Sequence, residues 1–277
     1  MIRAVALAVL FGACGRVGFD STSEQCKPTV WSPELHLLEN ISVDDANDWE
    51  PTVSPDGLTI VWVTYRASNE GQLYVATRTS IEDEFSKTSI HLIPGFGSAT
   101  TDVFGPTWSI DGTKLYFTID TQRVAPYLGN GQFGAAMDSD IPVDQFTFAA
   151  PDEVFSTEFE ALDDYDLLYH KLVGGNWVPQ TLPAAYVRHG SNQSDAWPTF
   201  DRGRQDLYWE HDESGAYIAR AHRDEGGPLP AQFEVLTDLG DDFSDPDLSA
   251  DGLRMYVGST RREGTDNDIY MLERVCE

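Results

Sequence analysis

Four twelve-residue stretches of this chain align with one another without a gap, and this repetition limits the possible folds more than any other feature. Each stretch begins with proline, continues through a short apolar segment and a turn, and ends in β-branched and aromatic residues. Residues of these types favour extended strands. The four stretches are 51–62, 106–117, 198–209 and 246–257.

Three of the four copies contain the side chains that a tight hairpin turn requires. An aspartate accepts hydrogen bonds from the turn backbone, and the glycine after it readily adopts a positive φ. These dipeptides are Asp56-Gly57, Asp111-Gly112 and Asp251-Gly252. The third copy has Arg202-Gly203 in their place, so we expect its turn to differ.

A further segment with the composition of a strand follows in several copies. Such segments lie at 71–78, 166–170, 215–220 and 268–272. No stretch longer than about ten residues has a sustained helical period. The sequence therefore predicts an all-β chain.

The repeated pattern has the form Pro-x-x-Ser-x-Asp-Gly-x-x-Leu-Tyr-Phe, followed by (Asp/Gly)-x-Leu-Tyr-Val-x-x-Arg. It resembles the WD-like β-propeller repeat of the TolB family. The resemblance is clear in four copies and by extension covers most of residues 31–277. It implies a single β-propeller of four-stranded blades and a role in protein–protein contacts of the bacterial cell envelope. Propellers host many unrelated activities, so the fold alone does not specify the function.

The spacing of the copies predicts the number of blades. The prolines that open them are 55, 92 and 48 residues apart, and a degraded copy at 147–156 fits the long middle interval. This gives five blades, within a range of four to six. The alternative is four blades with an insertion across 119–163. The chain ends on a third strand, so an N-terminal strand at 34–38 is expected to close the ring.

The first residues have the features of an export signal. Arg3 precedes a short apolar stretch that is about half as long as a membrane span requires. Residues 10–14, Leu-Phe-Gly-Ala-Cys, resemble a bacterial lipobox. We expect a signal peptide at 1–13, a lipid on Cys14, a tether at 14–30 and the propeller at 31–277. An ordinary signal peptide with an incidental cysteine is the alternative.

Lipid on Cys14 would leave two further cysteines, Cys26 and Cys276. An even number of cysteines outside the cytoplasm favours a disulfide. This pair lies near the two ends of the mature chain, so a bond between them would help to close the ring. Two free thiols, or pairing between chains, remain the alternatives.

The formal net charge is −28. A surface of this charge repels nucleic-acid phosphates and anionic lipid, so we expect no nucleic-acid partner and membrane contact only through the lipid anchor. The charge is compatible with a cationic partner, with a divalent metal or simply with solubility.

Acidic residues recur just before the first strand of successive blades. In a propeller these loops gather around one mouth of the central channel, where carboxylates could hold Ca²⁺ or receive a basic peptide segment. The alternative is that they cap turns and face solvent. The candidate binding residues are Asp48, Glu50, Asp102, Asp195 and Asp245. Trp49 and Trp197 stand beside them and could contact a ligand or pack between blades.

The sequence has no common protease or esterase motif, and no dinucleotide-binding motif in the required context. Residues 129–134 fit G-x-G-x-x-G but lack the strand and helix that a dinucleotide site needs. The six histidines have no zinc-ligand spacing, and neither H-E-x-x-H nor G-x-S-x-G occurs. The sequence therefore predicts a monomeric, lipid-anchored scaffold that binds an envelope protein or ligand on the periplasmic or cell-surface face of the outer membrane. It predicts no catalytic residues and no cofactor beyond the Ca²⁺ considered above. The alternative is a propeller glycoside hydrolase or carbohydrate-binding protein that uses channel carboxylates.

Overall fold

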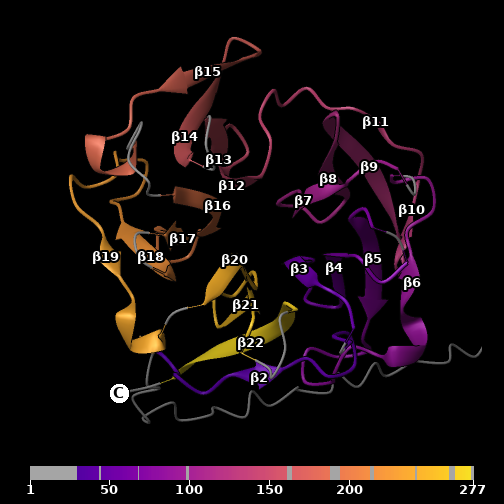
Figure 1. Ribbon diagram of the computed structural model, residues 1–277. Helices are drawn as coiled ribbons and strands as arrows, with labels where there is room; N and C mark the ends of the chain where they lie inside the picture. Colours follow the sequence, from indigo (N-terminus) through magenta and orange to yellow (C-terminus); the bar gives the residue numbers. More distant parts are fainter. Residues whose placement is uncertain are drawn as a thin grey trace, which may run out of the picture.

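Each of the four twelve-residue stretches contributes to the first two strands of an antiparallel sheet, and the degraded copy at 147–156 does so in a fifth sheet. The five sheets surround a common axis (Figure 1). The computed structural model describes residues 30–43, 45–67, 69–97, 100–160, 164–187, 194–212, 215–240, 242–261 and 266–275. The sheets are the blades of a five-bladed β-propeller, which confirms the predicted all-β fold. The first strand of each blade lies nearest the axis in Figure 1.

The blades follow one another along the chain. Blade 1 contains β3 (Asp48–Val53), β4 (Thr59–Thr64), β5 (Gln72–Thr77) and β6 (His91–Leu92). Blade 2 contains β7 (Phe104–Trp108), β8 (Lys114–Ile119) and β9 (Thr121–Gly129), with β10 (Gln132–Phe133) and β11 (Met137–Asp138) both paired to β9. Blade 3 contains β12 (Phe146–Ala150), β13 (Glu153–Glu160), β14 (Asp164–Val173) and β15 (Asn176–Gln180). Blade 4 contains β16 (Ser194–Asp201), β17 (Asp206–Asp212), β18 (Ala216–His222) and β19 (Glu234–Val235).

Blade 5 joins the two ends of the described chain. Its inner strands are β20 (Phe243–Leu248), β21 (Arg254–Ser259) and β22 (Asp268–Val275). β1 (Val30–Trp31) and β2 (His36–Leu37) both pair with β22, so the N-terminal segment completes the last blade as expected. Among the described connecting segments, three form short 3₁₀ helices: η1 (Lys87–Ser89), η2 (Ala184–Tyr186) and η3 (Thr237–Leu239).

Blade 3 settles the number of blades. The degraded copy forms β12 and β13, and β14 includes the predicted third strand at 166–170. Four blades with an insertion across 119–163 are therefore excluded. Cys14, Cys26, Cys276 and the predicted signal peptide lie outside the described residues. No helix in the described part of the chain is long and apolar enough to cross a membrane.

The turns follow the expected chemistry. In blade 1 the hydroxyl of Ser54 donates to Asp56 at 2.6 Å, Asp56 accepts the N–H of Leu58 at 3.0 Å, and Gly57 has φ 72°. The turn of the third copy differs, as its sequence predicts. Its left-handed residue is Gln205, with φ 60°, and Asp201 accepts the N–H of Arg204 at 3.0 Å.

Five apolar clusters fill the five junctions between neighbouring blades. Trp62 and Trp209 are fully buried in two of these junctions, and Trp108 is 6% exposed in a third. These three tryptophans therefore belong to the core. Each blade therefore depends on its neighbours to bury its faces.

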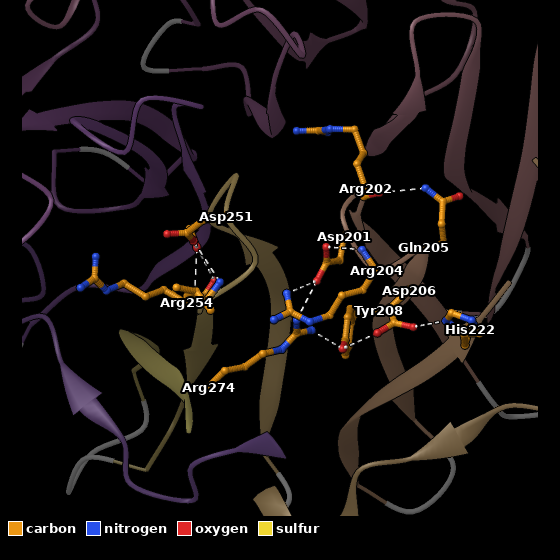
Figure 2. A network of polar contacts seen from close by, with 12 residues as sticks. Asp201, Arg202, Arg204, Gln205, Asp206, Tyr208, His222, Asp251, Arg254 and Arg274 are labelled. Atoms are coloured by element: carbon orange, nitrogen blue, oxygen red, sulfur yellow. Dashed lines mark hydrogen bonds and ion pairs between the residues drawn. The ribbon is translucent and has the colours of Figure 1, made fainter. Parts of the chain in front are cut away.

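A polar network adds to the junction between blades 4 and 5, where the ring closes. Figure 2 shows the guanidinium of Arg274 between Asp201 and Tyr208. It donates to the carboxylate of Asp201 at 2.7 Å and to the hydroxyl of Tyr208. It also lies 4.4 Å from the ring centroid of Trp31 in β1. The network ties the N-terminal strand, β22 and blade 4 together.

Every blade has a left-handed residue at the start of its first strand. In four of the five blades, the pairing of the first strand with the second strand shifts register at this residue, as in a β-bulge. A non-glycine residue in this conformation costs about 1–3 kcal/mol, so the surrounding structure must hold it there. The five residues are Glu50 (φ 48°), Gly105 (62°), Gln145 (44°), Trp197 (49°) and Asp245 (52°). These five residues repeat around the axis and lie at the centre of the channel.

Candidate functional site: an acidic channel mouth

One mouth of the channel opens into a cavity of 690 Å³, which we call the acidic mouth. Its walls come from the loops before the first strands and from residues near the connections between second and third strands. Six carboxylate side chains line it, and among the described residues its lining contains no Arg, Lys or His. The six are Glu50, Asp102, Asp144, Glu210, Asp242 and Asp245. This lining makes the mouth strongly attractive to positive charge.

Glu50 reaches across the channel and divides it. One carboxylate oxygen accepts the N–H of Gly105 in blade 2 at 2.6 Å, and the other accepts the indole N–H of Trp197 in blade 4 at 3.2 Å. Burial and the nearby charge of Asp245 raise the pKa of Glu50 to about 8, although the two N–H donors act in the opposite direction. Glu50 therefore connects three blades and holds its own carboxylate in place.

Asp245 lies beside Glu50 and is 3% exposed. It accepts the backbone N–H of Glu50 at 3.4 Å, and burial raises its pKa to about 6. Glu210 in β17 is 9% exposed, and burial followed by the charge of Asp245 raises its pKa well above the ordinary value. Three carboxyl groups thus share the inner wall of the mouth, and their full ionisation at once is unfavourable.

The outer part of the mouth is more open to water. Asp102, Asp144 and Asp242 are exposed and come from the approaches to blades 2, 3 and 5. Asp102 accepts the N–H of Gly71 at 2.5 Å and the hydroxyl of Tyr65 at 3.3 Å. We call these three aspartates the rim.

The structure brings Glu50, Asp102 and Asp245 together at the mouth, but Asp48 and Asp195 do not line it. Asp48 is fully buried, accepts the indole N–H of Trp62 at 3.0 Å and pairs with Arg66 at 2.7 Å. Asp195 is 1% exposed and accepts the indole N–H of Trp209 at 2.6 Å. Both aspartates satisfy buried tryptophans between strands, as buried N–H groups require.

The sequence itself contains the signal that separates these two aspartates from the others. Each lies three residues before the proline of its copy, and each copy ends in tryptophan. In the copies that end in Phe117 and Val257, the same early position holds Val103 and Phe243, both fully buried. An aspartate therefore occurs there only where an indole N–H needs an acceptor.

Glu210 was missed by the sequence analysis because it follows the third repeat and has no recurrent acidic counterpart. The equivalent residues of three other copies are Val63, Thr118 and Gly258, each paired across to the residue two before the proline. A carboxylate at a position that is otherwise neutral departs from the repeat. This difference from the other copies could have identified Glu210 as a candidate functional residue from the sequence alone.

The two loop tryptophans both contribute to the mouth and to packing. Trp197 and Trp49 are half-buried and line the cavity, and Trp49 also packs against the apolar cluster between blades 1 and 2. Trp197 lies 5.4 Å from Tyr165 between ring centroids, and Trp49 lies 5.7 Å from Tyr65. Aromatic faces thus stand beside the carboxylates.

Beyond Glu50 the channel narrows to a cavity of 80 Å³. The residue after each proline faces it: a threonine in blades 1, 2 and 4, and Asp247 in blade 5. Asp247 accepts the N–H of Val53 at 2.8 Å, and burial raises its pKa to about 7 although Arg202 lies nearby. This part of the channel is too small for more than a few water molecules.

The predicted Ca²⁺ site can be compared with this geometry. Within the residues that the structure describes, no three His, Cys, Asp or Glu side chains are arranged to hold a metal ion. Ca²⁺ prefers six to eight oxygen ligands. The Ca²⁺ site therefore stays a prediction.

Comparisons with known proteins inform the fold. Protein-family models gave no match to the chain, and curated proteins gave none. Among solved structures, one assigned as TolB from Agrobacterium tumefaciens has a TM-score of 0.50 and 15% identity, and the match covers 84% of this chain and 78% of that chain. TolB from Acinetobacter baumannii has a TM-score of 0.43 and 14% identity, over 83% of this chain and 50% of that one, so this chain spans about half its length.

An enzyme is also among the similar structures. Oligogalacturonate lyase from Vibrio parahaemolyticus has a TM-score of 0.45 and 8% identity, and the match covers 91% of this chain and 94% of the lyase. Identities of this size do not transfer an activity. The likeness to the Agrobacterium structure shows that this chain shares the β-propeller fold of a TolB-like protein.

Proposed function

We propose that this chain is a binding scaffold of the bacterial cell envelope and that it binds a partner protein at the acidic mouth. The observation that carries the proposal is a 690 Å³ cavity lined by six carboxylates and, among the described residues, by no basic side chain. Its volume is that of a pocket for a small ligand or a few side chains. The partner surface is therefore expected to be basic.

A glycoside hydrolase is the alternative, and the hydrogen bonds of the mouth support it less well. Such an enzyme needs one carboxyl as acid and a second, free carboxylate as base or nucleophile. The carboxylate of Glu50 already accepts two N–H groups, and one oxygen of Asp102 accepts another. These contacts suit a rigid binding wall better than a carboxylate that must attack a substrate.

We also propose that the scaffold is held at the outer membrane by a lipid on Cys14 and that Cys26 and Cys276 form a disulfide. The sequence at 10–14 supports the first proposal. The second is supported by the pairing of the nearest described residues, because Val30 and Val275 are partners across β1 and β22. A crosslink there would restrict the unfolded chain over nearly its whole length.

Neutralising the rim should weaken capture of the partner. We expect D102N/D144N/D242N to retain about one tenth of the partner that the wild-type chain captures from the solubilised envelope, since each exposed charge contributes up to about 1 kcal/mol. The control is D152N/D224N/E225Q, which neutralises three exposed carboxylates outside the mouth. Captured proteins are quantified by mass spectrometry. Equal capture by the two triple variants contradicts the proposal.

A further inference from the structure

Glu210 has an oxygen for which the protein supplies no partner. Its side chain is nine-tenths buried, it lines the acidic mouth, and its Oε2 accepts no hydrogen bond from the protein. The backbone N–H of Asp245 donates to this carboxylate, but its second oxygen has no donor. A buried carboxylate oxygen without a donor is costly while the group is ionised, and a bound cation would offset that cost. This oxygen is a second observation, independent of the acidic composition of the mouth, that points to a ligand.

The surroundings of Glu210 increase the need for a positive charge. Asp245 and Glu50 lie on the same inner wall, and both are near enough for their charges to affect Glu210. No Arg, Lys or His stands among the described residues that line the cavity. A positive charge that favours the ionised form of Glu210 would therefore come from a ligand.

The shape of the mouth favours an organic cation over a metal ion. No three potential metal-binding side chains come together among the described residues, whereas two aromatic pairs, Trp197 with Tyr165 and Trp49 with Tyr65, line the same cavity. Aromatic faces attract ammonium and guanidinium groups and also pack against methylene groups. Opposite-charge hydrogen bonding to Glu210 would then fix the end of the ligand.

We propose that the acidic mouth takes up the ammonium or guanidinium end of a lysine or arginine side chain from the partner protein, with the carboxylate of Glu210 as its acceptor. The aliphatic part of that side chain lies between the aromatic pairs, and the rim aspartates surround its entry. This proposal rests on the proposed function and specifies which chemical group of the partner enters the mouth.

The test uses small compounds that carry a single side chain. The full chain, labelled with ¹⁵N and held in a mild detergent, is titrated with N-acetyl-lysine methylamide and with N-acetyl-arginine methylamide. The indole N–H signal of Trp197 reports binding, because this group lies in the mouth and donates to Glu50. We expect saturable shifts with at least one of the two compounds, and none with the uncharged N-acetyl-norleucine methylamide. The comparison of the lysine compound with the norleucine compound tests the need for a positive charge without any substitution in the protein.

Glu210→Gln should weaken binding of the charged compounds at least tenfold. Glu225→Gln, which changes an exposed glutamate outside the mouth, should leave it unchanged. Failure of both charged compounds to bind, or equal binding by E210Q and E225Q, overturns the proposal. If the rim variant has meanwhile lost partner capture, the proposed function stands and only the assignment of the cation fails.

Two further titrations distinguish other sources of positive charge. If free 1,5-diaminopentane binds to the mouth and neither amino-acid compound binds, the proposal of a partner side chain is wrong and the ligand is a small amine. CaCl₂ that shifts the Trp197 signal more than NaCl of equal ionic strength, and loses this effect in E210Q, would overturn the organic cation in favour of a metal. We expect neither result.

Discussion

Replacing Arg274 with methionine should lower the free energy of unfolding by about 3 kcal/mol. The substitution removes the guanidinium that joins Asp201, Tyr208 and Trp31 where the ring closes. Asp201 is 4% exposed, so its carboxylate would lose a partner that water cannot replace. Arg204 also contacts Asp201, at 3.2 Å, and keeps the loss near the lower end of the range for buried pairs.

Urea denaturation measures this effect, and Arg123→Met is the matched control. Arg123 pairs with Asp138, which is 83% exposed, so its replacement should change the free energy of unfolding by less than about 1 kcal/mol. A loss in R274M no larger than the loss in R123M would show that the network does not hold the ring closed.

Replacing Asp247 with asparagine should stabilise the protein in alkaline solution. Burial raises the folded-state pKa of Asp247 from 3.8 to about 7. A carboxyl with a raised pKa stabilises the fold most below its unfolded pKa, and this contribution is lost as the pH rises through about 7. Between pH 4.5 and 8.5 the wild type should therefore lose about 3 kcal/mol more than D247N, since one pKa unit corresponds to about 1.4 kcal/mol.

The comparison of variants isolates this one group. Other carboxyl groups and the net charge of −28 also destabilise the wild type as the pH rises, but D247N retains nearly all of them. Asparagine still offers an oxygen to the N–H of Val53. Asp152→Asn, at an exposed site, should follow the wild type. Parallel stability curves for wild type and D247N would contradict the burial of an ionisable Asp247.

The architecture could be predicted from the sequence because every blade repeats one local sequence pattern. The proline, the turn and the strand at 51–62 recur with the same chemistry, and even the degraded copy at 147–156 keeps enough of it to be found. The divided outer strand of blade 2 could not be predicted in this way. β10 and β11 both pair with β9 and have no counterpart in the repeated pattern.

The site was only partly predictable, because proximity to the mouth does not fix the direction of a side chain. Asp48 and Glu50 are two residues apart, yet one is buried against Trp62 and the other crosses the channel. The positive φ of Glu50 produces this difference, and it is set by packing around the axis rather than by local sequence. Glu210 comes from a second strand, so its place in the mouth depends on the register of β16 with β17.

The central claim is that the partner binds at the acidic mouth, and site-specific photo-crosslinking tests it most directly. p-Benzoylphenylalanine replaces Tyr65, which lines the mouth, or Leu128, which is 68% exposed in β9 and does not. Each variant is irradiated in living cells of the organism that makes the chain, and crosslinked proteins are identified by mass spectrometry. We predict that position 65 crosslinks to a specific envelope protein and that position 128 does not. Crosslinking of such a protein at position 128 with none at position 65 would contradict the claim.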